Sequence, residues 1–319
     1  MKYLKEKTSG FIQEQRGFIR YGKGAAMVLF MVFAAYFFED REIILPELAA
    51  LSIGCLVYMN SEWRAKPWDL FKLPTATAIA GFFINMLALP LLVKLILAIA
   101  FTITLLFIAK NFLAPALATA LLPIVTNCTS YLFLWSIVFF TLLLAISVLI
   151  RDGRSVKNEH SFAVPKLGMM TYGIIILMWF SVCYWTGHIE MAAIPPVIVV
   201  GLENSHKSNF TIKTGIRQIV VLSIAALAGS YFFSHIEYPA ISVLLSFITV
   251  YGLLRLMKMN LPPAYAMSIL PMVLHAVNPL DFSLRVFIMA SVIFLSIYLI
   301  KKQEGKLRSV VQVLRKKTE

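Results

Sequence analysis

The chain has 319 residues, of which 60% are hydrophobic and 14% are charged, and its net charge is +13. Soluble domains contain roughly 45–50% apolar residues, so this composition excludes an ordinary soluble protein and predicts one that lies in a lipid bilayer. Only helices and closed barrels satisfy every backbone hydrogen bond in lipid, and the apolar runs here are unbroken rather than alternating. We therefore predict an all-α, polytopic transmembrane helical bundle.

The first half of the chain divides into three parts. Residues 1–23 are basic and precede the first apolar run, so we expect a cytoplasmic amphipathic stretch that stays in the mature protein. A first transmembrane repeat of six segments follows at 24–150, and a basic cytoplasmic linker follows at 151–167. The six segments are expected at about 24–38, 43–60, 74–90, 91–109, 113–127 and 131–150.

The second half repeats this plan. A second transmembrane repeat is expected at 168–301, and a basic amphipathic tail at 302–319 suits a helix that lies on anionic headgroups. Its segments are expected at about 168–187, 192–204, 214–234, 238–256, 262–276 and 282–300.

Matched residues at one spacing indicate that the two repeats arose by duplication. The run 115–125, Pro-Ala-Leu-Ala-Thr-Ala-Leu-Leu-Pro-Ile-Val, returns 148 positions later as Pro-Ala-Tyr-Ala-Met-Ser-Ile-Leu-Pro-Met-Val at 263–273. The same spacing relates three further matches: 78–81 to 226–229, Tyr36 to Tyr184, and Glu42 to Glu190. Four matches in one register are unlike chance similarity between apolar runs.

Lysine and arginine concentrate in every second connection, and cytoplasmic flanks carry the excess of positive charge. This pattern predicts a multi-pass protein of the bacterial cytoplasmic membrane with both termini in the cytoplasm. Six crossings per half make the repeats parallel, related by an axis along the membrane normal. Because the basic residues are spread over loops rather than gathered on one soluble domain, we expect no binding to nucleic acid.

The repeated Pro-Ala segment is too short to cross a bilayer. Fourteen residues at 113–126 span about 21 Å as a helix, against a hydrocarbon core of about 30 Å. We interpret the prolines as helix starts set within the membrane, whose first N–H groups face a cavity and favour an anion. This predicts a solute site between the two helices, with candidate residues Pro115, Ala116, Thr119, Asn127, Pro263, Ala264, Ser268 and His275. The alternative is that proline and small residues only kink and pack these helices.

Four further residues are candidates for coupling or gating. Glu203 and His206 close the eighth segment, where a half-buried carboxylate beside a histidine could exchange a proton. Glu42 and Glu190 are matched across the halves at the outer end of the second span. The alternative for Glu203 and His206 is that they begin a solvated loop. The alternative for Glu42 and Glu190 is that they lie near a helix N-terminus, where negative charge is favoured. Asn127 and His275 are also 148 positions apart, so we expect them at one level on the paired helices. The alternative is that both lie at the outer interface and form hydrogen bonds with water.

One family resemblance rests on two short stretches. Residues 261–271, Leu-Pro-Pro-Ala-Tyr-Ala-Met-Ser-Ile-Leu-Pro, resemble the His-Pro-Pro-Ala segment that names the HPP family of integral membrane proteins. Residues 65–70, Ala-Lys-Pro-Trp-Asp-Leu, resemble the family's Ala-Gln-Pro-Arg-Asn loop, and Leu261 stands in place of the naming histidine. The resemblance implies a solute transporter, because members of the family are associated with nitrite transport.

The sequence has no GxSxG, Walker loop, HExxH or acidic cluster for a metal, so we expect neither an enzyme nor a cofactor. Cys55, Cys128 and Cys183 are interpreted as apolar packing residues. The first hypothesis is a secondary transporter or channel for a small, nitrite-like anion or a small polar solute, with proton coupling and homo-oligomer formation left open. The alternatives are a non-transporting membrane scaffold or assembly protein, and an exporter of aromatic or amphipathic organic acids, which a wide aromatic-lined cavity would support.

Overall fold

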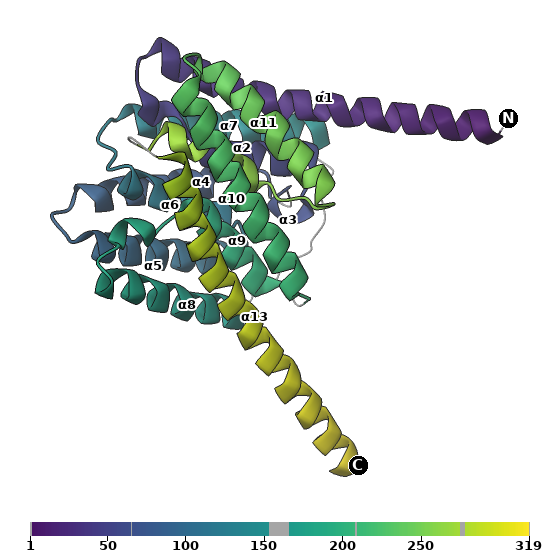
Figure 1. Cartoon of the computed structure of the whole chain (residues 1–319), viewed down its shortest axis with the longest axis vertical. Coiled ribbons are helices and arrows are strands. Elements are labelled where there is room, and N and C mark those ends of the chain that lie inside the picture. Colours follow the sequence, from purple (N-terminus) through teal and green to yellow (C-terminus); the bar gives the residue numbers. More distant parts are fainter. Residues whose placement is uncertain (1, 65, 153–165, 208, 275–277, 319) are drawn as a thin grey trace.

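The computed structural model describes residues 2–64, 66–152, 166–207, 209–274 and 278–318. Helices and connections make up these residues, and no strand occurs among them. Six of the helices are long and apolar enough to cross a membrane. The predicted fold class is therefore confirmed: the chain is an all-α, multi-pass membrane protein. Figure 1 shows the bundle, with the N-terminal end of α1 and the C-terminal end of α13 projecting from it.

The helices of the first half are α1 (Lys2–Phe37), α2 (Pro46–Ser52), α3 (Ser61–Arg64), α4 (Asp69–Met86), α5 (Leu91–Ala109), α6 (Pro115–Val125) and α7 (Leu132–Asp152). Those of the second half are α8 (Lys166–Trp185), α9 (Pro195–His206), α10 (Ile212–His235), α11 (Pro239–Leu256), α12 (Pro263–Ile269) and α13 (Pro279–Thr318). A π-helical turn, Ile53–Val57, continues α2, and a 3-10 turn, Leu270–Met272, continues α12. Further 3-10 turns, Arg41–Ile43 and Ile189–Met191, precede α2 and α9.

Each of the twelve predicted segments falls on one of these helices. The predicted terminal stretches 1–23 and 302–319 are continuous with α1 and α13 instead of forming separate helices. Most of the predicted linker, residues 153–165, lies outside the described part of the chain.

The backbone repeats with the same spacing as the sequence. Glu39 and Gly187, which follow the first helix of each half, have positive φ angles of 54° and 75°. Lys110 and Lys258, which follow α5 and α11, have φ angles of 48° and 50°. Each pair is 148 positions apart. Positive φ is uncommon for residues other than glycine, so this agreement shows that the two halves share one backbone plan.

Proline sets the starts of the short helices. The residues before α2 and α9 are extended in nearly the same way, with φ and ψ of −112° and 95° at Leu45 and of −111° and 101° at Ile194. A proline follows each of them at the first helical position, where its missing N–H group is no loss. α6 has 11 residues and spans about 17 Å, so it covers only part of a bilayer core.

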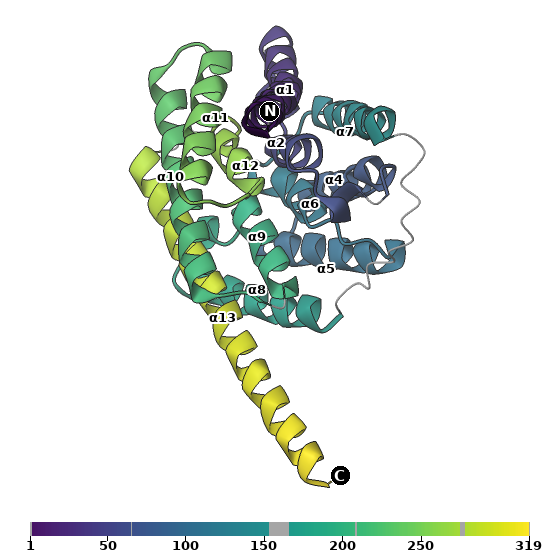
Figure 2. The ribbon, with the colours of Figure 1, turned by 90° about the vertical axis from the view of Figure 1, so that its right-hand side faces the viewer.

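The four short helices form the centre of the molecule. Figure 2 shows α2, α6, α9 and α12 in the middle, with α10, α11 and α13 to one side and α4 and α7 to the other. α12 packs on α2, and α6 packs on α9, so the short helices of each half contact those of the other. Residues on these helices, such as Leu48, Ala116, Val197 and Ala264, are fully buried or nearly so. The centre of the interface between the halves is therefore built from segments that cannot cross a bilayer by themselves, and contacts of α1 with α11 and of α5 with α8 add to it.

Candidate functional site between the two halves

The starts of the Pro-Ala helices differ from the prediction. Their first amide groups donate hydrogen bonds of 3.0 Å to carbonyl groups in the preceding turn: Ala116 to Leu113, Leu117 to Ala114, Ala264 to Leu261, and Tyr265 to Pro262. The prediction that free N–H groups of these turns face a cavity is therefore wrong. A tight turn before each proline supplies the missing acceptors, which the sequence pattern does not reveal.

The candidate residues on these two helices are packed in the core. Pro115, Ala116, Thr119, Pro263, Ala264 and Ser268 are all buried, and they line none of the three cavities described below. The Thr119 hydroxyl lies 2.7 Å from the Thr77 hydroxyl, and the Ser268 hydroxyl donates to the Tyr265 carbonyl at 2.9 Å. These contacts agree with the packing alternative. A role of these residues in solute binding stays a prediction, and His275 lies outside the described residues.

Glu47 is an acid that the sequence patterns did not single out. It lies in the first turn of α2 and is only 2% exposed, and neither carboxylate oxygen has a hydrogen-bond partner among the described residues. The helix start of the other half matches α2 in geometry but lies 149 positions later, at Pro195 rather than 148 positions after Pro46, so the position equivalent to Glu47 is Pro196. Glu47 therefore has no counterpart among the duplicated residues. The sequence does place Glu47 inside the predicted segment 43–60. An acid within an apolar span is a candidate functional residue, so this position could have identified it.

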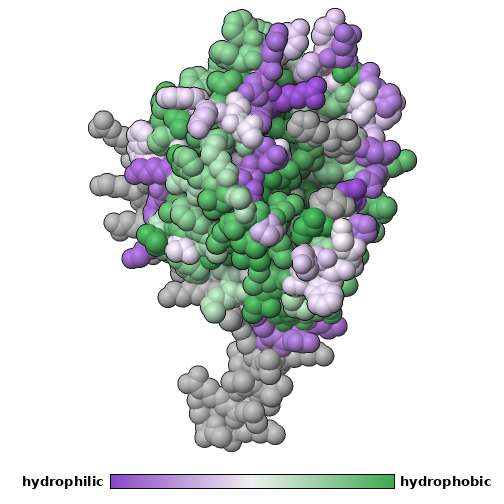
Figure 3. Space-filling model, turned by 90° about the vertical axis from the view of Figure 1, so that its left-hand side faces the viewer, coloured by the Kyte–Doolittle hydropathy of each residue, from purple (hydrophilic) through white to green (hydrophobic). Residues whose placement is uncertain are grey.

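Two neighbouring cavities open between the halves on the side of the bundle that carries connections 38–45 and 186–194. We name this side the outer side, after the orientation that the charge pattern predicts. Figure 3 shows the face on the left of Figure 1, where hydrophilic residues are scattered among hydrophobic ones. The larger cavity, here named the outer cavity, has a volume of about 880 Å³ and lies between α1 on one side and α10, the start of α11 and the 3-10 turn after α12 on the other. The second has a volume of about 440 Å³ and includes Asn127. Leu274 and Asn278 line both.

A third cavity, of about 360 Å³, lies at the opposite end of the same interface. Tyr58, Asn60 and Glu62 from the first half face Glu203, His206 and Lys207 of the second, together with Phe112. The rings of Phe112 and His206 are 4.8 Å apart, and His206 Nδ1 has no hydrogen-bond partner within the described part of the chain. The structure thus brings the predicted pair Glu203 and His206 into one polar cavity, here named the inner cavity. Their part in coupling stays a prediction.

Glu42 fixes one outer connection to another. Its carboxylate accepts hydrogen bonds from the Ser130 amide at 2.6 Å, the Thr129 amide at 3.2 Å and the Cys128 thiol at 2.9 Å. Burial, and then the bond to Glu42, raises the pKa of the Cys128 thiol well above its usual range. Asn85 donates to the Cys128 carbonyl at 3.0 Å and so ties α4 to the same connection. Glu42 therefore has a structural task, and gating by it stays a prediction. The side chain of Glu190 lies outside the described residues.

Comparison with known proteins adds no relative: no protein-family model matches the chain, and neither do curated proteins or solved structures. The resemblance to the HPP family stays a prediction.

Proposed function

We propose that the chain is a secondary transporter that moves a small solute between its two halves and couples this movement to protons. One continuous segment joins the two ends of the interface. Ile44 at its start lines the outer cavity, and Tyr58 at its end lines the inner cavity. Glu47 lies between them on α2. Duplicated halves, helices too short to span the bilayer, and a polar site at the interface are common features of secondary transporters.

The buried carboxylate of Glu47 is the observation that carries the proposal. An isolated ionised carboxylate in a dry apolar interior costs several kcal/mol, so the neutral, protonated form is favoured in this conformation. Water that reaches Glu47 when the halves rearrange would favour the ionised form and release the proton. One proton taken up and released in each cycle couples transport to the proton gradient.

The surroundings of Glu47 offer no charge that would replace this proton. Helices α1, α6, α7 and α12 and the π-helical turn contact α2. Their described ionisable side chains, cysteine aside, are Arg20, Tyr21, Lys23, Tyr36, Arg151 and Tyr265. None of them forms a hydrogen bond or an ion pair with Glu47. Arg151 donates to the Leu56 carbonyl at 2.6 Å, at the far end of the segment.

The π-helical turn Ile53–Val57 supports a segment that changes shape during transport. Such turns leave the regular α-helical hydrogen-bond pattern, and they occur frequently at functional sites. The turn follows α2 directly and ends beside the inner cavity. A rearrangement here would move Glu47 and the wall of the inner cavity together.

The test is solute-evoked proton movement in proteoliposomes that contain an entrapped pH-sensitive dye. The panel contains nitrite and other small anions, small polar solutes, and aromatic and aliphatic carboxylic acids. Protein-free liposomes correct for acids that cross the bilayer unaided. For at least one solute, the wild-type chain is expected to change the internal pH. Glu47→Gln is expected to abolish this change while solute exchange across the membrane continues.

Glu304→Gln is the matched control, because it also replaces an acid by its amide, on a part of α13 that lines none of the three cavities. It is expected to behave as the wild type does. Coupling that survives in Glu47→Gln would contradict the assigned role of Glu47. Absence of flux for every solute, together with capture of a partner protein in fixed ratio, would instead favour the scaffold hypothesis.

A further inference from the structure

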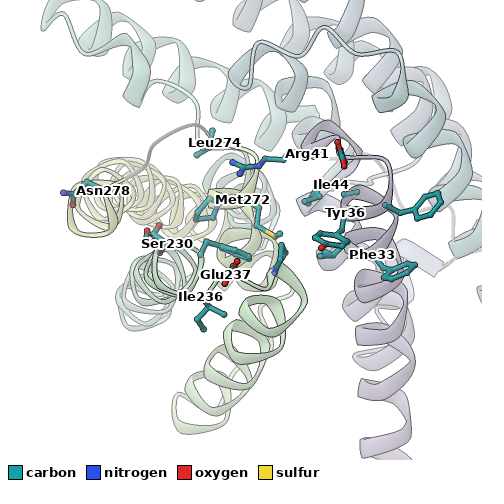
Figure 4. Close-up of a pocket in the computed structure, with 18 residues that line it drawn as sticks. Phe33, Tyr36, Arg41, Ile44, Ser230, Ile236, Glu237, Met272, Leu274 and Asn278 are labelled. Carbon is teal, nitrogen blue, oxygen red and sulfur yellow. Dashed lines mark hydrogen bonds between the residues drawn. The ribbon is translucent and has the colours of Figure 1, made fainter.

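The outer cavity has the size and the lining of a small-molecule site. Its volume of about 880 Å³ lies within the range of roughly 300–1,000 Å³ that is usual for ligand pockets. Phe33, Tyr36 and Phe37 of α1 contribute three aromatic rings, and Phe233 of α10 contributes a fourth. Figure 4 shows Phe33 and Tyr36 on α1 at one side, and Ser230, Ile236 and Glu237 at the other. Flat aromatic rings on both walls favour an aromatic guest.

The matching space of the other half is the smaller second cavity, which is lined by Leu91, Thr126 and Ile189, the matches of Pro239, Leu274 and Arg41. The positions that match Ser230 and Phe233 are packed there. Phe82, the match of Ser230, is fully buried, and its ring centroid is 6.2 Å from that of Phe133 and 5.6 Å from that of Tyr131. Asn85, the match of Phe233, is hydrogen-bonded to the Cys128 carbonyl. The duplication therefore left a cavity on each side, and the one lined by Ser230 and Arg41 is about twice as large as its match.

Ser230 leaves a buried hydroxyl without a partner at the wall of this cavity. The residue is 1% exposed, and its Oγ atom makes no hydrogen bond to any described residue. Buried polar groups in folded proteins nearly always have a partner. This hydroxyl is therefore free to bond a group that enters the cavity. A phenylalanine fills the same position in the other half, and packing alone would be satisfied by it.

The charged residues at the rim also belong to this half only. Arg41 lines the cavity and forms no ion pair with a described acid, and its match in the other half is Ile189. A guanidinium group of this kind binds a carboxylate through two parallel hydrogen bonds. Glu39 and Glu237 also line the rim, and their matches are Gly187 and Leu89. These two acids of the cavity lining repel a second negative charge on the guest.

We infer that the outer cavity is a binding site for an aromatic monocarboxylate, with the carboxylate at Arg41 and the ring between Tyr36 and Phe233. A polar substituent on the ring would form a hydrogen bond with the Ser230 hydroxyl. The inference deepens the proposed function, on which it rests for its role in transport, because it names the solute class. Binding itself is tested separately from transport.

The experiment measures binding of 2-naphthoate to the purified full chain in detergent by calorimetric titration, with empty micelles as the blank. Arg41→Ile copies the matched residue of the other half and is expected to weaken binding at least tenfold. Ser230→Phe copies Phe82 and is expected to abolish binding by filling the cavity. Thermal unfolding and gel filtration of each variant show whether it is folded.

One control compares the same substitution at matched positions of the two halves, and two others change the ligand. Tyr36→Leu is expected to weaken binding several-fold, whereas Tyr184→Leu, the same change at the matched position, is expected to leave it unchanged. Naphthalene-2,6-dicarboxylate is expected to bind much more weakly than 2-naphthoate, because its second charge meets Glu39 and Glu237. Decanoate is also expected to bind more weakly, because it offers no ring.

Several results would overturn the inference. One is that folded Arg41→Ile binds 2-naphthoate as tightly as the wild type does. Another is that the dicarboxylate binds as tightly as 2-naphthoate. A third is that decanoate binds more tightly than 2-naphthoate, which would indicate a groove for acyl chains. The two proposals fail separately. Binding of 2-naphthoate without flux would refute the transporter and retain the site. Proton-coupled flux of other solutes by a chain that does not bind 2-naphthoate would refute the site and retain the transporter.

Discussion

Gly81 in α4 lies directly on the backbone of Ala120 in α6, since a Cβ atom on Gly81 would be 2.1 Å from the Ala120 carbonyl oxygen. Gly229 in α10 and Ser268 in α12 repeat this contact, also at 2.1 Å, with both residues displaced by 148 positions. Glycine allows two helix backbones to approach closely in a membrane, where van der Waals packing holds helices together. This pair of contacts holds the short central helices of both halves.

Replacement of either glycine by alanine should therefore force the two helices apart. We expect Gly81→Ala and Gly229→Ala each to destabilise the protein by about 1–3 kcal/mol or more, the range for overpacked cores. Reversible unfolding in detergent measures the change. Gly252→Ala in α11 is the control, because a Cβ there would meet no atom within 4 Å, and it should change stability little. Equal stability of Gly81→Ala and Gly252→Ala would contradict the close approach.

Glu47→Leu should stabilise the folded chain while it abolishes proton coupling. The substitution removes two buried oxygen atoms that have no hydrogen-bond partner among described residues, and an unpaired buried polar group costs about 1–3 kcal/mol. Thermal unfolding in detergent should show a higher midpoint than in the wild type. A gain in stability with a loss of function is the pattern of a functional residue rather than a packing residue. A lower midpoint would show that Glu47 has a stabilising partner.

Asn204 and Gln218 form a reciprocal pair of side-chain hydrogen bonds, of 2.7 Å and 3.1 Å, that joins α9 to α10 in the core. Asn204→Leu should cost about 1–3 kcal/mol, because it leaves the Gln218 amide unsatisfied. The double variant Asn204→Leu, Gln218→Leu should recover most of this loss, since no polar group then remains unpaired. A double-mutant cycle on unfolding free energies measures the coupling. Additive losses would contradict the pairing.

Cys128 should react slowly with a maleimide at neutral pH, and the rate should rise steeply in alkaline solution. Burial and the bond to Glu42 raise the pKa of this thiol, so little of the reactive thiolate is present near pH 7. Glu42→Gln should lower that pKa toward its usual value and increase the rate several-fold at a fixed pH. The measurement uses a chain in which Cys55 and Cys183 are replaced by alanine. Glu237→Gln, an acid elsewhere on the outer side, should leave the rate unchanged.

Local patterns were enough to predict the helices. Unbroken apolar runs place each predicted segment on an observed helix, because a chain in lipid must satisfy its backbone hydrogen bonds within each segment. Prolines at 46, 115, 195 and 263 lie at helix starts, where their fixed φ angle suits the first turn. The duplication was also visible, because matched residues keep their spacing of 148 positions when the halves diverge elsewhere.

The site was decided by tertiary contacts that no local pattern contains. The amide groups of Ala116 and Ala264 were expected to be free, but they donate hydrogen bonds to the carbonyl groups of Leu113 and Leu261 in the preceding turn. Glu47 is buried because helices distant in the chain, α6, α7 and α12 among them, pack on α2. The outer cavity joins Arg41 to Ser230, which are far apart in the chain. The sequence by itself thus determined the helices and their duplication, since these depend on neighbouring residues. Tertiary structure decided which polar groups stay unpaired, since that depends on the distant partners each one meets.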